Sequence, residues 1–229
     1  MKTVIIIPYR DREEHLNYFL KHSAPFIKEN MNDVEILIVE QSNDKLFNRG
    51  KLLNIGVHYT NNEDTLFITH DVDVNPIALK TIDLYNLNVD ENEIIGIYTS
   101  ECNTLGGLIK FKGKTFNCIN GFPNNFWGWG TEDKCLQNRA EFYNIKISKN
   151  IKNKDENRFE YFNIFDHAGR VRHPHEYGIH WHNEYNIFKN LSRENKEVII
   201  KSSGLINIDY HVKDVLKIND YIKKILVDI

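Results

Sequence analysis

Two aspartates separated by one residue, Asp71 and Asp73 in the segment HDVD, are the first candidates for chemistry in this sequence. On an extended segment, carboxylates at positions i and i+2 point the same way, which suits a hard divalent cation. Mg²⁺ or Mn²⁺ bound there can bridge the phosphates of a nucleotide and offset the charge on a departing diphosphate. Because a DxD triplet also occurs as a turn that caps a helix, the motif alone leaves both interpretations open.

Histidines supply a second set of candidate metal ligands. The segments HPH, with His173 and His175, and HWH, with His180 and His182, both place imidazoles two residues apart. Either pair could complete a coordination shell begun by Asp73, and nitrogen ligands favour Mn²⁺ over Mg²⁺. We prefer His180 and His182, because HWHNEYN leads into an amphipathic stretch that could hold them rigidly. The alternative is that these histidines are surface or packing residues.

The segment NGFPNNFWGWGTED places Trp127 and Trp129 between glycines. Glycines give the backbone a freedom that a rigid core element avoids, so this segment is typical of an aromatic lid. It ends in Glu132 and Asp133. Acids are common at helix starts because the helix dipole stabilises them, but an acid beside a lid can also act as a general base toward a sugar hydroxyl. Core packing is the alternative interpretation of both tryptophans.

The elements that must position these groups alternate between strand and helix. Apolar, β-branched runs predict strands over residues 3–8, 34–39 and 66–69, and apolar spacing predicts a helix after the first strand and another over residues 49–59. This alternation predicts a parallel α/β sheet, in which ligands bind outside the carboxyl ends of the strands.

Polar groups follow each predicted strand. They are Arg10 and Arg12, then Glu40 and Gln41, then Asp71 and Asp73. Arginines in these loops, together with Arg49 at a helix start, suit phosphate because the guanidinium presents a fork of donors. A solvated surface charge is the alternative for each arginine. We therefore expect the first half of the chain to bind a nucleotide.

The second half of the chain is less regular. We expect a capping box of Asp11 with Glu14 at the first helix, and the later elements are a strand at 94–98, a helix at 132–143, a polar loop at 150–157, and closing strands in GLINIDYHV (204–212) and YIKKILVDI (221–229). Residues 158–182 are rich in aromatics and histidine and give no prediction of secondary structure.

Composition excludes several classes of protein. The chain has 229 residues and a formal net charge of −3, so it is large enough for one real core and gives no reason to expect nucleic acid as a partner. Cys102, Cys118 and Cys135 show no CxxC spacing, which argues against disulfides and structural zinc. The N-terminal apolar run is too short for a signal peptide or membrane span, so we expect a cytoplasmic-type soluble protein. No Walker motif, GxGxxG or nucleophile elbow occurs.

Taken together, these segments resemble the beta-1,4-galactosyltransferase family. The matching blocks, in the family's order, are IIIPYRDREEHL, FNRGKLLNIG, HDVD, LGG and INGFPNNFWGWGTED. The resemblance implies a GT-A type glycosyltransferase fold, an α/β architecture whose central, mostly parallel sheet is flanked by helices. It implies one catalytic domain over residues 1–229, with nucleotide-sugar binding up to about residue 100 and the acceptor, lid and closing strands beyond. The implied reaction is an inverting transfer of a hexose from a UDP-sugar to a sugar hydroxyl of a glycan or glycoconjugate. Galactose is the preferred candidate for the hexose.

The resemblance also assigns roles to residues. The implied donor-binding residues are Pro8, Tyr9, Arg10, Arg12, Phe47, Arg49, Asp71, Val72 and the lid residue Trp129. Asp73 would bind Mn²⁺, with Mg²⁺ as the alternative metal. Glu132 and Asp133 would hold the acceptor, with Asp133 as the base. Gly106, Gly107 and Thr104 would shape the donor and acceptor specificity.

Departures from the family pattern leave alternatives open. Thr104 stands two residues before GG, where the family carries a tyrosine that restricts the donor to galactose, so UDP-GalNAc and UDP-glucose remain candidate donors. WGWGTEDKC lacks the family's third carboxylate, and the longer chain after Asp133 prevents a confident alignment of the histidines. We also expect no stem or membrane anchor. A nucleotide-sugar or glycan-binding protein without turnover and a metal-dependent phosphohydrolase are the rival classes.

Overall fold

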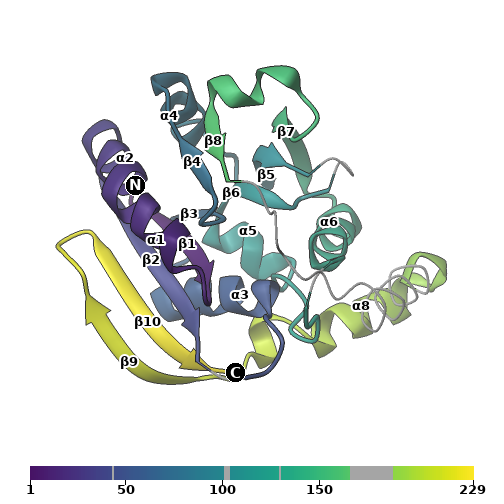
Figure 1. Cartoon of the computed structure of the whole chain (residues 1–229). Coiled ribbons are helices and arrows are strands. Elements are labelled where there is room, and N and C mark those ends of the chain that lie inside the picture. Colours follow the sequence, from purple (N-terminus) through teal and green to yellow (C-terminus); the bar gives the residue numbers. More distant parts are fainter. Residues whose placement is uncertain (43, 101–103, 129, 166–187) are drawn as a thin grey trace.

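A mixed sheet forms the centre of the computed structural model, which describes residues 1–42, 44–100, 104–128, 130–165 and 188–229 (Figure 1). Its strand order is β7-β5-β6-β3-β1-β2-β10-β9. The bounds are β1 (Thr3–Tyr9), β2 (Val34–Gln41), β3 (Leu66–Thr69), β5 (Glu93–Thr99), β6 (Gly107–Lys112), β7 (Lys146–Lys152), β9 (His211–Lys217) and β10 (Ile222–Asp228). The strands predicted over residues 3–8, 34–39, 66–69 and 94–98 are confirmed to within two residues at each end.

Most strand pairs of this sheet are parallel. β1 pairs in parallel with β2 and β3, β2 with β10, and β5 with β7, whereas β6 and β9 pair antiparallel with their neighbours. A separate two-stranded antiparallel sheet joins β4 (Val74–Pro76) to β8 (Phe162–Ile164). The predicted α/β architecture with a mostly parallel sheet is therefore confirmed.

Helices cover both faces of the sheet (Figure 1). The helices of the described residues are α1 (Glu13–Tyr18), η1 (Phe19–Ser23), α2 (Ala24–Asn30), α3 (Arg49–Thr60), α4 (Leu79–Tyr85), α5 (Gly113–Cys118), α6 (Glu132–Phe142) and α8 (Arg193–Ser202), with short 3₁₀ turns η2 (Glu156–Glu160) and η3 (Leu205–Asn207). Of these, α8 extends away from the sheet (Figure 1). The predicted helices at 49–59 and 132–143 are confirmed. α3 begins at Arg49 because Asn48 accepts a hydrogen bond from the backbone N–H of Lys51 at 2.9 Å.

The apolar run in β1 is continuous because each face of this central strand meets a helical layer. Ile5 and Ile7 belong to a core cluster with Phe19 and other residues of α1, η1 and α2. Val4 and Ile6 belong to a second cluster with the inward residues of α3, α5 and α6. A strand buried on both sides carries no polar alternation, which explains the sequence TVIIIP.

Three local predictions are wrong. Asp11 and Glu14 form no capping box: the residue before α1 is Arg12, which makes no side-chain cap, and Asp11 adopts a φ of +52°. The predicted loop at 150–157 begins inside β7, an edge strand whose polar residues hide its periodicity.

The first closing strand was placed too early in GLINIDYHV. In this segment only the last residues are extended, since β9 starts at His211 and residues 205–207 form η3. The backbone N–H groups of Leu205 and Ile206 donate to the backbone and side-chain oxygens of Asn120 at 3.2 and 2.9 Å, and not to a neighbouring strand. The second closing strand is confirmed as β10. Among the helices in the described part of the chain, none has the length and apolarity needed to cross a membrane.

Candidate active site

The turn after β1 brings Arg12 to Asp73, at the carboxyl ends of the central strands. Nη1 of Arg12 donates a hydrogen bond to Oδ2 of Asp73 at 3.1 Å. The side chain of Asp73 is only 5% exposed, so Arg12 offsets the cost of burying its charge. A predicted donor-binding arginine and the predicted metal ligand therefore lie in direct contact.

Arg10 and Phe47 form a second contact between predicted donor-binding residues. The guanidinium carbon of Arg10 lies 5.7 Å from the centre of the Phe47 ring, and Nη1 donates to the backbone oxygen of Lys45. In contrast, Pro8 and Tyr9 are buried in β1, and burial raises the pKa of Tyr9. Arg10 therefore presents a partly exposed side chain beside the ring of Phe47.

The HDVD segment is a turn, so the expectation of an extended segment with two parallel carboxylates is wrong. The backbone N–H of Val74 donates to the backbone oxygen of Asp71 at 3.2 Å, and β4 begins there. Asp71 accepts a hydrogen bond from Arg49, and Asp73 accepts one from Arg12. The side chain of Val72 points into the hydrophobic core, where it is 4% exposed. Each carboxylate therefore has its own arginine.

His70 anchors this turn, a role that the sequence did not reveal. The ring is fully buried; its Nδ1 lies 2.9 Å from the backbone oxygen of Asp71, and its Nε2 lies 2.8 Å from the hydroxyl of Tyr85. Because a carbonyl oxygen only accepts, Nδ1 carries the proton and Tyr85 donates to Nε2. Burial lowers the pKa of His70 to about 4, so the ring is neutral and ties the turn to α4.

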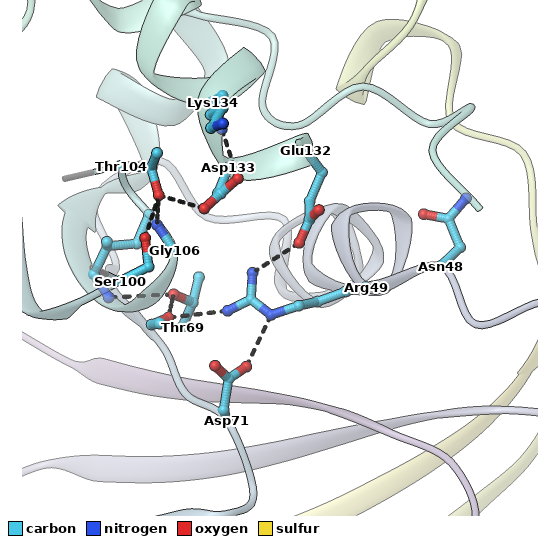
Figure 2. A network of polar contacts seen from close by, with 12 residues as sticks. Asn48, Arg49, Thr69, Asp71, Ser100, Thr104, Gly106, Glu132, Asp133 and Lys134 are labelled. Carbon is cyan, nitrogen blue, oxygen red and sulfur yellow. Dashed lines mark hydrogen bonds and ion pairs between the residues drawn. The ribbon is translucent and has the colours of Figure 1, made fainter. Parts of the chain in front are cut away.

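Arg49 lies between the two acidic segments of the site (Figure 2). Its Nε donates to Oδ1 of Asp71 at 2.8 Å, its Nη2 donates to the backbone oxygen of Gly107 at 3.0 Å, and its Nη1 lies 3.8 Å from Oε1 of Glu132. Burial acts to lower the pKa of Arg49, but the charges of Asp71 and Glu132 outweigh it and the net pKa is raised. Within the described residues the buried Nη1 atom has no hydrogen-bond partner, and Glu132 is the acidic side chain that it faces.

Glu132 begins α6 and faces Arg49. Its side chain is 14% exposed. Burial raises the pKa of Glu132 to about 7, and the charge of Asp133 adds to this effect, although Arg49 opposes it. Glu132 can therefore hold a proton near neutral pH, which lets it donate as well as accept hydrogen bonds.

Asp133 and Thr104, which the sequence assigned to different roles, meet in space (Figure 2). The hydroxyl of Thr104 donates to Oδ2 of Asp133, and the backbone N–H of Lys134 donates to Oδ1 at 2.8 Å. Ser100, which no sequence motif indicated, lies 2.6 Å from the Thr104 hydroxyl through its own Oγ. The predicted base thus shares a hydrogen-bonded cluster with the predicted specificity residue.

The glycines of the WGWG segment adopt conformations that other residues avoid. Gly128 has a φ of +87° and donates its N–H to the backbone oxygen of Phe47 at 2.8 Å, while Gly130 has a φ of +112° with open space around it. Trp127 is half-buried against the core, and the Nζ of Lys45 lies 5.4 Å from its ring. The core interpretation thus holds in part for Trp127.

Several predicted residues lie outside the described ranges. These are the lid residue Trp129 and the histidines His173, His175, His180 and His182. In the ranges that are described, no three His, Cys, Asp or Glu side chains form a group that could hold a metal ion. Asp73 supplies one hard, anionic oxygen ligand at the end of the sheet, which fits Mn²⁺ or Mg²⁺ chemically but is not a complete coordination shell.

A mostly parallel sheet with arginines and aspartates at its carboxyl ends, faced by acids at a helix start, defines a GT-A type glycosyltransferase fold. Solved structures agree with this class. The catalytic domain of Drosophila beta-1,4-galactosyltransferase 7 with xylobiose matches with a TM-score of 0.74 at 22% identity, covering 99% of this chain and 93% of that one. A mutant of that enzyme in complex with manganese, UDP-Gal and xylobiose matches with a TM-score of 0.73 at 21% identity and the same coverage.

Sequence comparison identifies the family. A family model for the N-terminal region of glycosyl transferase group 7 matches residues 1–86, and one for the N-terminal domain of galactosyltransferase matches residues 95–168. The chain belongs to the beta-1,4-galactosyltransferase family.

Individual relatives show how much of the chain is shared. Beta-1,4-galactosyltransferase 4 of Cricetulus griseus is 36% identical over an alignment of 156 residues that covers 65% of this chain and 45% of that protein. Beta-1,4-galactosyltransferase 2 of Homo sapiens is 29% identical over an alignment of 220 residues that covers 92% of this chain and 55% of that protein. The chain therefore spans about half the length of the curated relatives it matches.

Proposed function

We propose that this protein is an inverting, metal-dependent glycosyltransferase that moves a hexose from a UDP-sugar to a sugar hydroxyl of a glycan. Galactose is the preferred candidate for the hexose. The observation that carries the proposal is the position of Arg49, which contacts Asp71 on the donor side and lies 3.8 Å from Glu132 on the acceptor side. In this proposal residues up to about 100 bind the nucleotide sugar, and the later residues supply the acceptor site and the lid. The complex of the Drosophila relative with manganese, UDP-Gal and xylobiose supports the choice of donor and metal.

The reaction would be a single displacement. Asp133 takes the proton of an acceptor hydroxyl while that oxygen forms a bond to the anomeric carbon, from the face opposite UDP. The bond between the anomeric carbon and the diphosphate breaks, and its electron pair leaves with UDP. Arg10 and Arg12 would offset the charge that builds on the diphosphate, and each such contact contributes about 3 kcal/mol in the transition state.

A divalent cation would be held by Asp73 and, in this proposal, by His180 and His182. When bound, Mn²⁺ or Mg²⁺ neutralises charge on the diphosphate leaving group. Asp73 now contacts Arg12, and a cation at this carboxylate would leave Arg12 free to donate to a phosphate oxygen.

The choice of donor depends on the space around Thr104. A threonine is smaller than the tyrosine of the family pattern, so UDP-GalNAc and UDP-glucose remain the alternative donors. Thr104 is buried beside Asp133, which supports its position at the reacting centre.

The experiment that tests the function is a panel of UDP-sugars with Mn²⁺ and simple glycan acceptors, read out by UDP release and by NMR of the product anomer. We expect transfer from one donor with inversion at the anomeric carbon. Asp133→Asn should abolish transfer while UDP binding is kept. Donor cleavage that survives this substitution would support a phosphohydrolase, and UDP-sugar binding without release from any donor would support a binding protein.

A further inference from the structure

The carboxylate of Asp133 is held by donors from two different parts of the chain. The backbone N–H of Lys134 donates to Oδ1 at 2.8 Å, a contact available to any acid at this helix position. The Thr104 hydroxyl donates to Oδ2 from a segment 29 residues away in the sequence. The contact with Thr104 therefore fixes the rotation of the carboxylate relative to the sheet, which the local contact cannot do.

The hydrogen bonds in this cluster have a defined direction. An ionised carboxylate only accepts, so the single proton of the Thr104 hydroxyl must be donated to Asp133. Ser100 Oγ lies 2.6 Å from the same hydroxyl oxygen and must therefore donate to it. The backbone N–H of Gly106 also approaches this oxygen, at 3.4 Å. The chain of donors thus runs from Ser100 through Thr104 to Asp133, and each bond polarises the next.

Gly106 closes the remaining side of the same carboxylate oxygen. A methyl group added at Gly106 would lie 2.5 Å from Oδ2 of Asp133 and 3.4 Å from the hydroxyl oxygen of Thr104. Oδ2 is therefore packed against a bare glycine backbone as well as bonded to Thr104. Figure 2 shows Ser100, Thr104 and Gly106 gathered on one side of Asp133.

We propose that Ser100 and Thr104 are positioning residues, a directional pair of hydroxyls that orients the Asp133 carboxylate for proton abstraction. This inference rests on the proposed function, in which Asp133 is the base. It also gives Thr104 a second role besides leaving room for the donor sugar: the hydroxyl matters as well as the small size of the side chain.

The test compares variants that keep or lose each hydroxyl. Thr104→Val replaces the hydroxyl by a methyl group of similar size and should lower kcat about 10- to 100-fold, the usual effect of losing a hydrogen bond to a charged group. Thr104→Ser restores the hydroxyl and should recover most of the loss. Donor KM and UDP affinity should change little, because the hydroxyl contacts the base. Thr115→Val is the matched control, since Thr115 is a buried threonine of α5 that donates to the backbone oxygen of Glu91.

A double-mutant cycle tests the direction of the chain. Ser100→Ala alone should lower kcat about fivefold, which corresponds to a neutral hydrogen bond. In the Thr104→Val background the same change should have no further effect, because the link to Asp133 is already broken. A crystal structure of Thr104→Val should show the Asp133 carboxylate rotated.

Three outcomes separate this inference from the proposed function. If the wild-type protein transfers sugar and Asp133→Asn is inactive, but Thr104→Val keeps its kcat and changes only donor KM, the positioning role is overturned and the function stands. Additive effects of the Ser100 and Thr104 changes would overturn the directional pair. A wild-type protein that transfers no sugar from any donor overturns the proposed function, and the inference with it.

Discussion

Nε of Arg49 and Oδ1 of Asp71 lie 2.8 Å apart, and this contact joins the start of α3 to the turn that follows β3. The two side chains are 15% and 29% exposed, so the pair is mostly removed from water. The same guanidinium reaches the backbone oxygen of Gly107 and lies near Glu132. One planar group with a fixed fork of donors therefore holds three separate segments of the site together.

Arg49→Lys should lower the transfer rate at least 100-fold, because an ammonium group cannot reach Asp71, Gly107 and Glu132 in the geometry of a guanidinium. Arg49→Met should in addition lower the free energy of unfolding by about 3 kcal/mol, since it leaves buried carboxylates without their partner. Urea unfolding and UDP-release assays measure the two effects.

The matched control for the loss of charge is Lys2→Met. Lys2 pairs with Glu35 at 2.8 Å, but these side chains are 40% and 52% exposed, so we expect a cost below about 1 kcal/mol. Equal costs for Arg49→Met and Lys2→Met would show that the Arg49 contacts do not hold the site together.

Glu132 should make stability depend on pH. Burial raises the pKa of Glu132 to about 7 in the folded protein, above its usual value of 4.5. Between these two values the folded state binds the proton more tightly than the unfolded state, so the free energy of unfolding falls as the pH rises from 4.5 to 7. The upper bound of this fall is roughly 3 kcal/mol.

Glu132→Gln removes this titration. Urea unfolding at pH 5, 6, 7 and 8 should show that the wild type loses stability relative to the variant as the pH rises, with no further relative change above about pH 8. Parallel curves for the two proteins would contradict the raised pKa.

β1, β2, β3, β5 and β10 could be predicted from the sequence, whereas β6, β7 and β9 could not. β1, β2 and β3 are apolar and β-branched because both of their faces are buried, so their sequence pattern is unambiguous. β7 and β9 lie at the two edges, where exposed side chains carry no alternation; β7 was not predicted as a strand, and β9 was placed too early. β6 lies inside the sheet, but its sequence GLIKFK contains the buried Lys110 and is therefore not a continuous apolar run.

The composition of the site could be predicted better than its contacts. The acids and arginines at strand ends were found because parallel strands place their carboxyl ends together. Which side chain contacts which acid could not be predicted, because the partners lie far apart in the sequence. Arg49 and Asp71 are 22 residues apart, and Thr104 and Asp133 are 29 residues apart. Ser100 and His70 belong to no motif, and only their neighbours in space reveal their roles.

Substitution by alanine should have different effects at the two adjacent glycines of the LGG segment, lowering mainly the transfer rate at Gly106 and mainly the stability at Gly107. In Gly106→Ala the new methyl group meets the end of the Asp133 side chain, which can rotate away. We expect a large loss of transfer, at least 50-fold, with a change below about 1 kcal/mol in the free energy of unfolding, because moving one side-chain rotamer costs little. UDP affinity should be kept.

Gly107→Ala is the matched comparison. Gly107 has a φ of +87°, and its new methyl group would meet the backbone oxygen of Tyr98, which cannot move alone. We expect a loss of about 2 kcal/mol in the free energy of unfolding from this strain. Both variants are measured by urea unfolding and UDP-sugar transfer. If Gly106→Ala is active, Asp133 does not need its present orientation.

Removal of divalent metal should abolish transfer, and the pattern of recovery should identify the ligands. After treatment with EDTA, added Mn²⁺ should restore more activity than Mg²⁺, because His180 and His182 would supply nitrogen ligands that Mg²⁺ binds poorly.

Asp73→Asn should lose the Mn²⁺ dependence of UDP binding, measured by titration calorimetry with and without the metal. Asp83→Asn, which changes an exposed aspartate of α4, is the control and should behave as the wild type. UDP binding by Asp73→Asn that still tightens with Mn²⁺ would place the metal elsewhere, and the contact between Arg12 and Asp73 would then be a permanent ion pair of the fold.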